Sequence, residues 1–264
     1  VKNKLFFFVN AEYTKTPSVA VRWRASANGV GDSDSYLSYA SIADMEKVSA
    51  FVKDKYGYDT GSFDSFPADE SNLKVLARLD WNINDRNKLA VRYNYTSNTA
   101  WNGPNGSSMD GGTRSAYNRT SLYSMSYANS MYSVNNIVHS VSVDLNSKIN
   151  LSNQFLATFS KLDDVRGTNS SEFPFIDIHD GTNTTTQYMA LGYELFTWNN
   201  AVHNTIANIK DDLVWYAGNH KVTGGISYEY QMADNAYMRN GTGYYRYKSV
   251  DDFIDGKTPE VVCL

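Results

Sequence analysis

Six charged residues stand where they could act together, because each alternates with apolar neighbours in a segment that reads as a β-strand. Side chains at every second position of a strand point to the same side of the sheet. Charges gathered on one face could line a path for a polar solute or grip an internal domain. They could equally form a wetted wall whose charges pair with one another. The six residues are Lys74, Arg78, Asp80, Lys88, Arg92 and Glu229.

No constellation for catalysis accompanies these charges. The histidines are scattered and show no HExxH motif or paired metal-ligand spacing. The acidic runs GDSDS at Gly31 and IDIHDG at Ile176 lack EF-hand spacing, so solvated loop acids are favoured over calcium ligands. The sequence therefore predicts a protein that is not an enzyme and has no cofactor or metal site. The histidines are His139, His179, His203 and His220.

Tyrosine supplies much of the apolar surface, with 20 Tyr beside 12 Phe and 5 Trp. Four tyrosines of one loop region could stack on sugar or peptide groups, since tyrosine combines an apolar ring with a polar tip. They could equally order the loop. They are Tyr117, Tyr123, Tyr127 and Tyr132.

Composition excludes several classes of protein. The formal net charge is −4, which gives no basic face for a nucleic acid. The single cysteine, Cys263, cannot form an internal disulfide and has no neighbouring metal ligands. The longest apolar run, LFFFV from Leu5 to Val9, is far shorter than the roughly 20 residues of a membrane helix. Any membrane span must therefore consist of strands.

The chain reads as a succession of antiparallel hairpins after a first strand that starts at Leu5. The first hairpin, Leu73 to Asn98, turns at NINDRN. Its first strand is apolar on one face and polar on the other except for Leu76, and its second strand repeats this scheme. A second turns at NSKINLSN, Asn146 to Asn153, and a third at AGNH, Ala217 to His220. In the third hairpin the facing of the incoming strand is uncertain, because two aspartates, Asp211 and Asp212, are adjacent.

Long connections separate these hairpins. Ser97 to about Arg119 and Asp163 to about Asn200 are predicted to be irregular, because they are rich in Gly, Asn and Ser or lack a period. Two loop segments carry helix signals, with a capping box at the start and Gly at the end: Ser41 to Gly57 and Ser249 to Gly256.

Short turns thus alternate strictly with loops of tens of residues, which is unusual in compact soluble domains. Outer-membrane β-barrels show this alternation, with strands of about 9 to 11 residues and aromatic girdles at both interfaces. We therefore predict an all-β, antiparallel, up-and-down transmembrane β-barrel with long extracellular loops and short helices. The predicted lipid-facing residues are Val75, Leu79, Val91, Tyr93, Ile226 and Tyr228. The predicted lumen-facing residues are the six charged residues above together with Thr223.

Five sequence blocks together resemble one family. KNKLFFFVNAEYT, LARLDWNINDRNKLAVRYNY, ELFTWNN, AGNHKVTGGISYEY and SVDDFIDG, in this order, are similar to the barrel of Oar-like TonB-dependent receptors of Bacteroidetes and related bacteria. The resemblance implies a barrel in the outer membrane of a Gram-negative bacterium, with an internal plug domain and energy from the TonB complex. It also implies uptake of an extracellular solute; the size of the loops favours a bulky peptide, protein or glycan.

The chain also departs from the complete pattern. It contains no recognisable plug, no TonB-contacting segment and no final aromatic strand, and it accommodates about eight strands where such transporters have roughly 22. We therefore expect residues 1–264 to be an internal part of one barrel domain. Two other functions stay open: a passive porin or surface adhesin, and a soluble secreted β-protein that binds carbohydrate.

Overall fold

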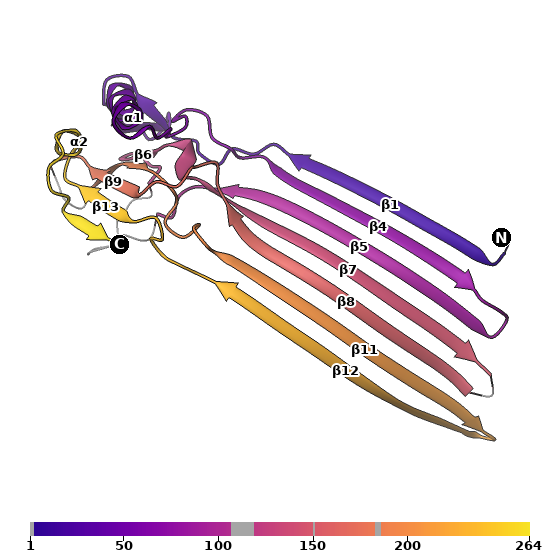
Figure 1. Ribbon diagram of the computed structural model, residues 1–264. Coiled ribbons are helices and arrows are strands. Elements are labelled where there is room, and N and C mark those ends of the chain that lie inside the picture. Colours follow the sequence, from indigo (N-terminus) through magenta and orange to yellow (C-terminus); the bar gives the residue numbers. More distant parts are fainter. Residues whose placement is uncertain (1–2, 107–118, 150, 183–185) are drawn as a thin grey trace.

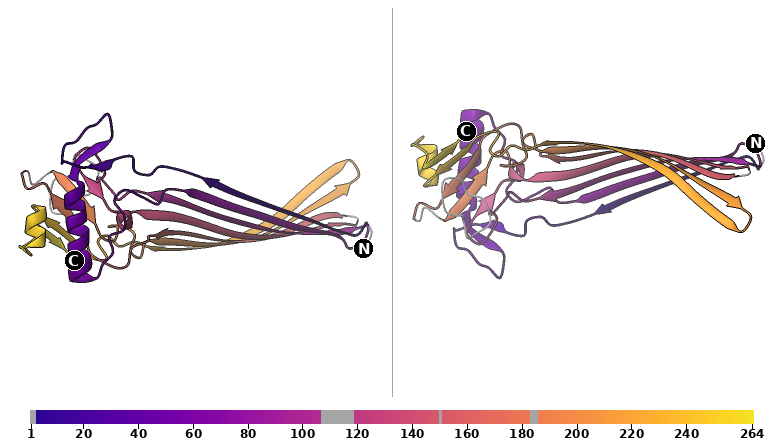
Figure 2. Two further views of the ribbon diagram at one scale, coloured as in Figure 1. Left: turned by 90° about the horizontal axis from the view of Figure 1, so that it is seen from above. Right: turned by 90° about the horizontal axis from the view of Figure 1, so that it is seen from below.

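Alternation of apolar and polar residues produces seven long strands that pair side by side in an antiparallel sheet. The computed structural model describes residues 3–106, 119–149, 151–182 and 186–264. Figure 1 shows the seven strands running parallel to one axis, with all the long connections folded together at one end and the short turns at the other. Figure 2 shows, from above and from below, that the sheet twists along its length. The predicted up-and-down architecture is confirmed.

The long strands follow each other in the sheet in sequence order, and each pairs antiparallel with its neighbours. Their bounds are β1 Leu5–Thr16, β4 Glu70–Asn82, β5 Asn87–Asn102, β7 Tyr132–Lys148, β8 Leu151–Gly167, β11 Ala201–Ala217 and β12 His220–Ala236. Among the described residues, β1 and β12 each pair with a long strand on one side only, so the sheet is not closed into a barrel.

The long connections form a packed body at the end of the sheet, which we call the cap: residues 17–69, 103–131, 168–200 and 237–264, as far as they are described. A five-stranded sheet in the order β14-β13-β9-β10-β6 is its centre, beside the small pair β2 and β3. The strands are β2 Arg24–Ser26, β3 Leu37–Ser41, β6 Met125–Ser126, β9 Phe175–His179, β10 Gln187–Leu191, β13 Tyr244–Tyr247 and β14 Val261–Cys263.

Two α-helices and a 3₁₀ turn complete the cap. Helix α1 spans Ile42–Tyr56 and α2 spans Val250–Ile254, and the turn spans Ala128–Ser130. Both predicted helices are present. The Ser41 hydroxyl caps the N-terminus of α1, and Gly57 adopts the left-handed backbone conformation at its C-terminus. The Ser249 hydroxyl caps the N-terminus of α2. Neither helix of the described chain is long and apolar enough to cross a membrane.

Several predicted boundaries are wrong because strands continue further than their sequence pattern indicates. The strand β5 reaches Asn102, so Ser97 to Asn102 is not part of a loop, and residues 107–118 lie outside the described part of the chain. The strand β8 continues to Gly167, and the segment that follows contains β9 and β10. The turn of the second hairpin is tighter than predicted, since strand pairing reaches Lys148.

The long strands also exceed the predicted 9 to 11 residues, and the described residues form seven of them where about eight were expected. The seven strands have 12 to 17 residues. The longest of them continue towards the cap, beyond the apolar part of the sheet. At about 3.3 Å per residue, the longest strand exceeds the thickness of the hydrocarbon core.

The register places like residues in rows across the sheet. Leu79 lies opposite Phe7 on one side and Val91 on the other, and the row continues through Val143, Ala157, Ile209 and Tyr228. The adjacent row contains Phe8, Arg78, Arg92, Ser142, Thr158, Asn208 and Glu229. Because residues directly opposite each other share a face, one face is apolar across all seven strands, and the other is mainly polar.

The apolar face has one polar interruption near the short turns. Asp211 lies in the row of Phe155 and Ile226 and accepts a hydrogen bond from Asn153 Nδ2 at 2.7 Å. Its neighbour Asp212 lies on the opposite face. The doubt about the facing of this strand is thus resolved in the structure by the register alone.

Candidate functional site

The six charged residues selected from the sequence all lie on the polar face of the long sheet. Arg78, Arg92 and Glu229 occupy one row, on strands β4, β5 and β12. Lys74, Asp80 and Lys88 occupy rows of the same face above and below it. Leu76 and Ala90 lie between these charges on the same face, and further along the face the hydroxyl of Ser160 donates to that of Ser140 at 2.9 Å. The structure therefore places these residues on one continuous surface.

Only some of the charged residues on this surface form ion pairs. Arg78 donates to both carboxylate oxygens of Asp80, at 2.8 and 2.7 Å. Lys74 Nζ lies 3.5 Å from a Glu12 carboxylate oxygen across the β1–β4 pair. Arg92 lies directly opposite Arg78, and no ion pair of its guanidinium is found among the described residues. The carboxylates of Asp80 and Asp144 therefore lie near these two guanidinium groups, and only Asp80 forms an ion pair with one of them.

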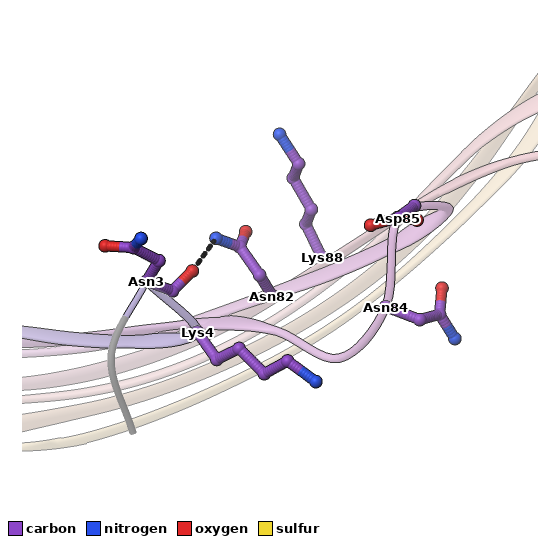
Figure 3. Close-up of a pocket in the computed structure, with 6 residues that line it drawn as sticks. All are labelled: Asn3, Lys4, Asn82, Asn84, Asp85 and Lys88. Atoms are coloured by element: carbon purple, nitrogen blue, oxygen red, sulfur yellow. Dashed lines mark hydrogen bonds between the residues drawn. The ribbon is translucent and has the colours of Figure 1, made fainter.

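A polar hollow lies at the rim of the short turns, where the start of β1 approaches the β4–β5 turn. Its volume is about 560 Å³. Asn82 Nδ2 donates to the carbonyl of Asn3 at 3.3 Å, and the side chains of Lys4 and Lys88 point to opposite sides of the sheet (Figure 3). The lining is Asn3, Lys4, Asn82, Asn84, Asp85 and Lys88, all of them polar and none of them apolar. We assign it to the hydrated rim.

In the cap, a buried ion pair joins connections that are far apart in the sequence. Arg119 Nε and Nη2 donate to the two carboxylate oxygens of Asp177 at 2.8 and 2.6 Å. The hydroxyl of Tyr244 and the amide of Gln187 donate to the same carboxylate, at 2.8 and 2.7 Å. The Arg119 guanidinium also lies over the Phe175 ring. This network links the second long connection, the third and the C-terminal segment.

Asp177 affects the protonation of two of its partners in this network. Burial alone would disfavour the guanidinium, but the attraction of Asp177 raises the pKa of Arg119 above its ordinary value. Burial, followed by the charge of Asp177, raises the pKa of the Tyr244 hydroxyl, so that hydroxyl remains a hydrogen-bond donor. The sequence-based interpretation of IDIHDG as solvated loop acids is wrong for Asp177, which is completely buried in β9.

The first connection docks through helix α1. Tyr188 on β10 donates its hydroxyl to the Asp44 carboxylate at 2.6 Å, and Tyr127 donates to the carbonyl of Met45 at 2.7 Å. Burial, with the Asp44 hydrogen bond second, raises the pKa of Tyr188 to about 12. Met45 and Val48 of the helix are fully buried against the cap sheet. All four connections thus form one packed body.

An aromatic pocket opens between the cap sheet and its helices. Its volume is about 360 Å³, which lies in the range of small-molecule sites. The rings of Tyr247 and Phe253 meet edge to face at 5.0 Å. Nearby, Lys55 Nζ lies 5.3 Å from the centre of the Tyr56 ring. The lining is Tyr56, Phe173, Pro174, Ile176, Tyr245, Tyr247 and Phe253. Sequence reasoning missed this pocket, because its residues come from three segments without a common motif.

His179 occupies a different environment from the other histidines. It is fully buried at the end of β9, and neither ring nitrogen has a hydrogen-bond partner in the described structure. Burial, assisted by the charge of Arg246, lowers the pKa of His179 to about 4. The 3.8 Å approach of Nδ1 to the Glu260 carboxylate is therefore not an ion pair at neutral pH.

The other candidates from the sequence lie in several parts of the structure. His139 and His203 lie on the long sheet, His220 begins β12, and Tyr117 lies outside the described residues. Tyr127 is fully buried, which favours the ordering role that was one of its two interpretations. In the GDSDS run, Asp32 accepts from the hydroxyl of Ser35 at 2.7 Å. Within the described ranges, no group of three or more His, Cys, Asp or Glu could hold a metal ion.

Comparison with known proteins identifies the family. A crystal structure of the outer membrane transporter YddB from Escherichia coli aligns with 78% of this chain at 13% identity and a TM-score of 0.46. The alignment covers 25% of that transporter, so this chain spans about a quarter of its length. No curated protein matches the sequence. Residues 48–258 match the family described as outer membrane beta barrel domain, so the chain belongs to that family and the protein lies in the outer membrane.

Proposed function

We propose that the chain is part of the barrel of a TonB-dependent outer-membrane transporter of the Oar-like type, and that its cap recognises the solute. In this account further strands of the full-length protein complete the barrel, and a plug domain occupies the lumen. The apolar face of the sheet contacts lipid, and the polar face contacts the plug and the passing solute. Transport is energised through the TonB complex.

The observation that carries the proposal is the packing of all four long connections into one cap at the rim opposite the short turns (Figure 1). Long connections are the extracellular ones in barrels of this class, so the solute meets the cap first. Loops on a rigid scaffold commonly carry binding sites. The Arg119–Asp177 pair and the buried core around Met45 supply that rigidity.

The aromatic pocket of the cap favours a solute with ring or alkyl groups. Tyr245 and Tyr247 present rings with polar tips, and Phe173 and Phe253 offer no hydrogen bonds. A pocket of about 360 Å³ accommodates one such group and not a whole peptide or glycan. We therefore infer that the pocket anchors one part of a bulky solute, while the rest lies on the cap surface.

The polar face suits a wall that contacts water, a plug or a solute. Its rows contain charges of both signs, from Arg78 and Arg92 on β4 and β5 to Glu229 on β12. Charges on a lipid-facing surface would each cost roughly 2 to 4 kcal/mol near the bilayer midplane. The face that holds Arg78 is therefore the one we assign to the lumen.

A passive porin or a surface adhesin is the alternative function. Membership of an outer-membrane family removes the soluble secreted protein from consideration. A porin would need an open lumen and no energy source, and an adhesin would need only the cap. The cap and the polar face are compatible with all three functions, so the distinction requires an experiment on living cells.

The experiment compares cells with and without the gene for the full-length protein. A defined mixture of peptides and oligosaccharides is supplied, and its depletion from the medium is followed by mass spectrometry, with and without collapse of the inner-membrane proton gradient. TonB-dependent transport predicts depletion that needs both the gene and the gradient. Depletion that persists without the gradient would indicate a porin, and surface retention without depletion would indicate an adhesin.

Recognition by the cap is tested separately with pocket variants of the full-length protein. Tyr247→Ala and Phe253→Ala remove the facing rings of the pocket. Depletion of the transported solute should be reduced in both variants, because the anchoring group loses its apolar contacts. Tyr216→Ala, an exposed tyrosine on β11 at the opposite end of the sheet, is the control. Equal depletion in all three variants would place recognition in the plug or lumen.

A further inference from the structure

On three neighbouring strands, a basic residue lies on the outer face on the cap side of its apolar residues. On β7 the run through Val143 and Val141 is followed by His139. On β8 Phe159 is followed at the next outward position by Lys161. The register sets His139 directly opposite Lys161, so their Cβ atoms are roughly 5 Å apart.

The third strand, β11, adds a second histidine, which pairs with an aspartate of β8. On β11 the outward positions after Ala207 are Thr205 and His203, and Thr205 lies opposite Lys161. His203 lies opposite Asp163 of β8, and its Nδ1 is 2.6 Å from the Asp163 carboxylate. We call His139, Lys161 and His203 the lysine–histidine cluster.

Contacts with neighbours fix two of these side chains. The hydroxyl of Tyr93 lies 2.8 Å from Nδ1 of His139, and the Tyr95 ring lies 5.0 Å from the same imidazole. Lys161 Nζ is 3.4 Å from the Asp163 carboxylate, but half of its side chain, 51%, remains exposed. The ammonium group is therefore available to a second anion, although Asp163 holds it on the outer face.

The height of the cluster limits what it can meet. The apolar rows below it contact hydrocarbon, and the cluster lies on the cap side of those rows on β7, β8 and β11, which is the extracellular side in this class of barrel. Charges are costly in the middle of a bilayer but nearly neutral at its interfaces. Basic groups at an interface attract anionic headgroups, by about 1 kcal/mol for each lysine or arginine.

Charge and shape together define the occupant. A phosphate group would meet the Lys161 ammonium and the His139 imidazole, while acyl chains would lie on the exposed surface of Phe159 and Val141 directly below. A free anion would use only the upper part of this surface, and a neutral lipid only the lower part. We propose that the lysine–histidine cluster binds the phosphate-bearing headgroup of a lipid in the outer leaflet.

This inference rests on the lipid-facing orientation of the apolar face and is independent of whether the barrel transports a solute. Its probe is phosphatidic acid, compared with the diacylglycerol that has the same acyl chains and lacks the phosphate. The full-length protein in a neutral detergent is titrated with each lipid, and bound lipid is counted by native mass spectrometry. Phosphatidic acid should be retained and diacylglycerol should be largely lost.

The chain offers a matched control lysine on the other face. Lys210 on β11 is half exposed, at 50%, and lies 2.6 Å from Asp212 two positions further on, which repeats the arrangement of Lys161 and Asp163. Lys161→Gln should weaken phosphatidic acid binding about five-fold, whereas Lys210→Gln should leave it unchanged. Lys161→Arg, which keeps the charge, should retain binding.

Three results would overturn the proposal. One is equal retention of diacylglycerol and phosphatidic acid; another is an equal effect of Lys161→Gln and Lys210→Gln. The third is displacement of phosphatidic acid by inorganic phosphate at an equal concentration, which would identify a site for a free anion. Circular dichroism of each variant confirms that the strands are formed, so a loss of binding is attributable to the site.

Discussion

The guanidinium of Arg119 and the carboxylate of Asp177 form an ion pair in the interior of the cap, with Nη2 2.6 Å from Oδ2 and exposures of 2% and 0%. The residues are 58 positions apart in the sequence. Each lies in a different long connection. The alternation of residues along the strands gives no sign that these two connections meet. Removing one partner of a buried pair leaves an unpaired charge and typically costs roughly 3 to 5 kcal/mol.

Arg119→Met should therefore open the cap while the long sheet stays folded. Limited proteolysis of the full-length protein in detergent is the measurement, and cleavage should become faster in residues 168–200. Asp177→Leu should have a similar effect, and the double variant should be more resistant than either single variant, because it contains no unpaired buried charge. Wild-type resistance in Arg119→Met would show that the pair does not hold the cap together.

Acid should weaken the cap through His179. Burial lowers the pKa of this imidazole from 6.5 to about 4, so between these values the unfolded chain binds a proton that the folded cap does not. Stability should thus fall as the pH is lowered from about 6.5 to about 4, by a total on the order of 3 kcal/mol, and should be insensitive to this group above that window.

His179→Gln removes the titrating group and keeps a polar side chain of similar size. Protease resistance of the cap, measured at a series of pH values, should decline less steeply between pH 6.5 and 4 in this variant than in the wild type. Identical profiles would mean that other groups, such as carboxylates of the cap, cause the whole acid dependence.

Gly192 should not tolerate a side chain. Its φ is +100°, and a Cβ there would collide with the carbonyl oxygen of Pro174, whereas Gly57 has a φ of +68° and open space around it. Gly57→Ala should lower the free energy of unfolding by about 1 to 2 kcal/mol, because the added Cβ is strained only by the left-handed backbone conformation and meets no other atom. Gly192→Ala should cost clearly more and expose the cap to protease. Similar costs for both would imply that β10 can move away from Pro174.

The parts of the fold that could be predicted from the sequence are those with local rules. The hairpin around NINDRN alternates at period two and turns on Asn and Asp, so its strands, turn and shared face follow from neighbours in the chain. The helix α1 carries its own caps at Ser41 and Gly57. None of these features depends on distant residues.

The cap could not be predicted in the same way. Strands β9 and β13 pair parallel, with Phe175 opposite Tyr244, and they are too short to show a period. The aromatic pocket depends on that pairing, and so does the burial of Asp177, which in the sequence looks like a loop acid. The six charged residues were found because alternation placed them, but whether they face the lumen is still a prediction.

Assembly in the membrane should distinguish the two faces. Leu79 lies in the apolar row and Arg92 in the polar row. Leu79→Arg should impair assembly of the full-length barrel, since a charge near the bilayer midplane costs roughly 2 to 4 kcal/mol, whereas Arg92→Leu should be tolerated. The amount of protease-resistant protein in isolated outer membranes is the readout. Equal loss in both variants would contradict the assignment of the faces.

The most direct test of the account is the environment of two adjacent side chains, Val91 and Arg92, in the full-length protein in lipid bilayers. Each is replaced by cysteine in a Cys263→Ser background and spin-labelled, and its collision rates with oxygen and with a water-soluble nickel chelate are measured by electron paramagnetic resonance. The account predicts that the label at position 91 collides mainly with oxygen, because it faces lipid, and that the label at 92 is reached by the chelate or is shielded by the plug. A label at position 92 that collides with oxygen as readily as the label at 91 would contradict it.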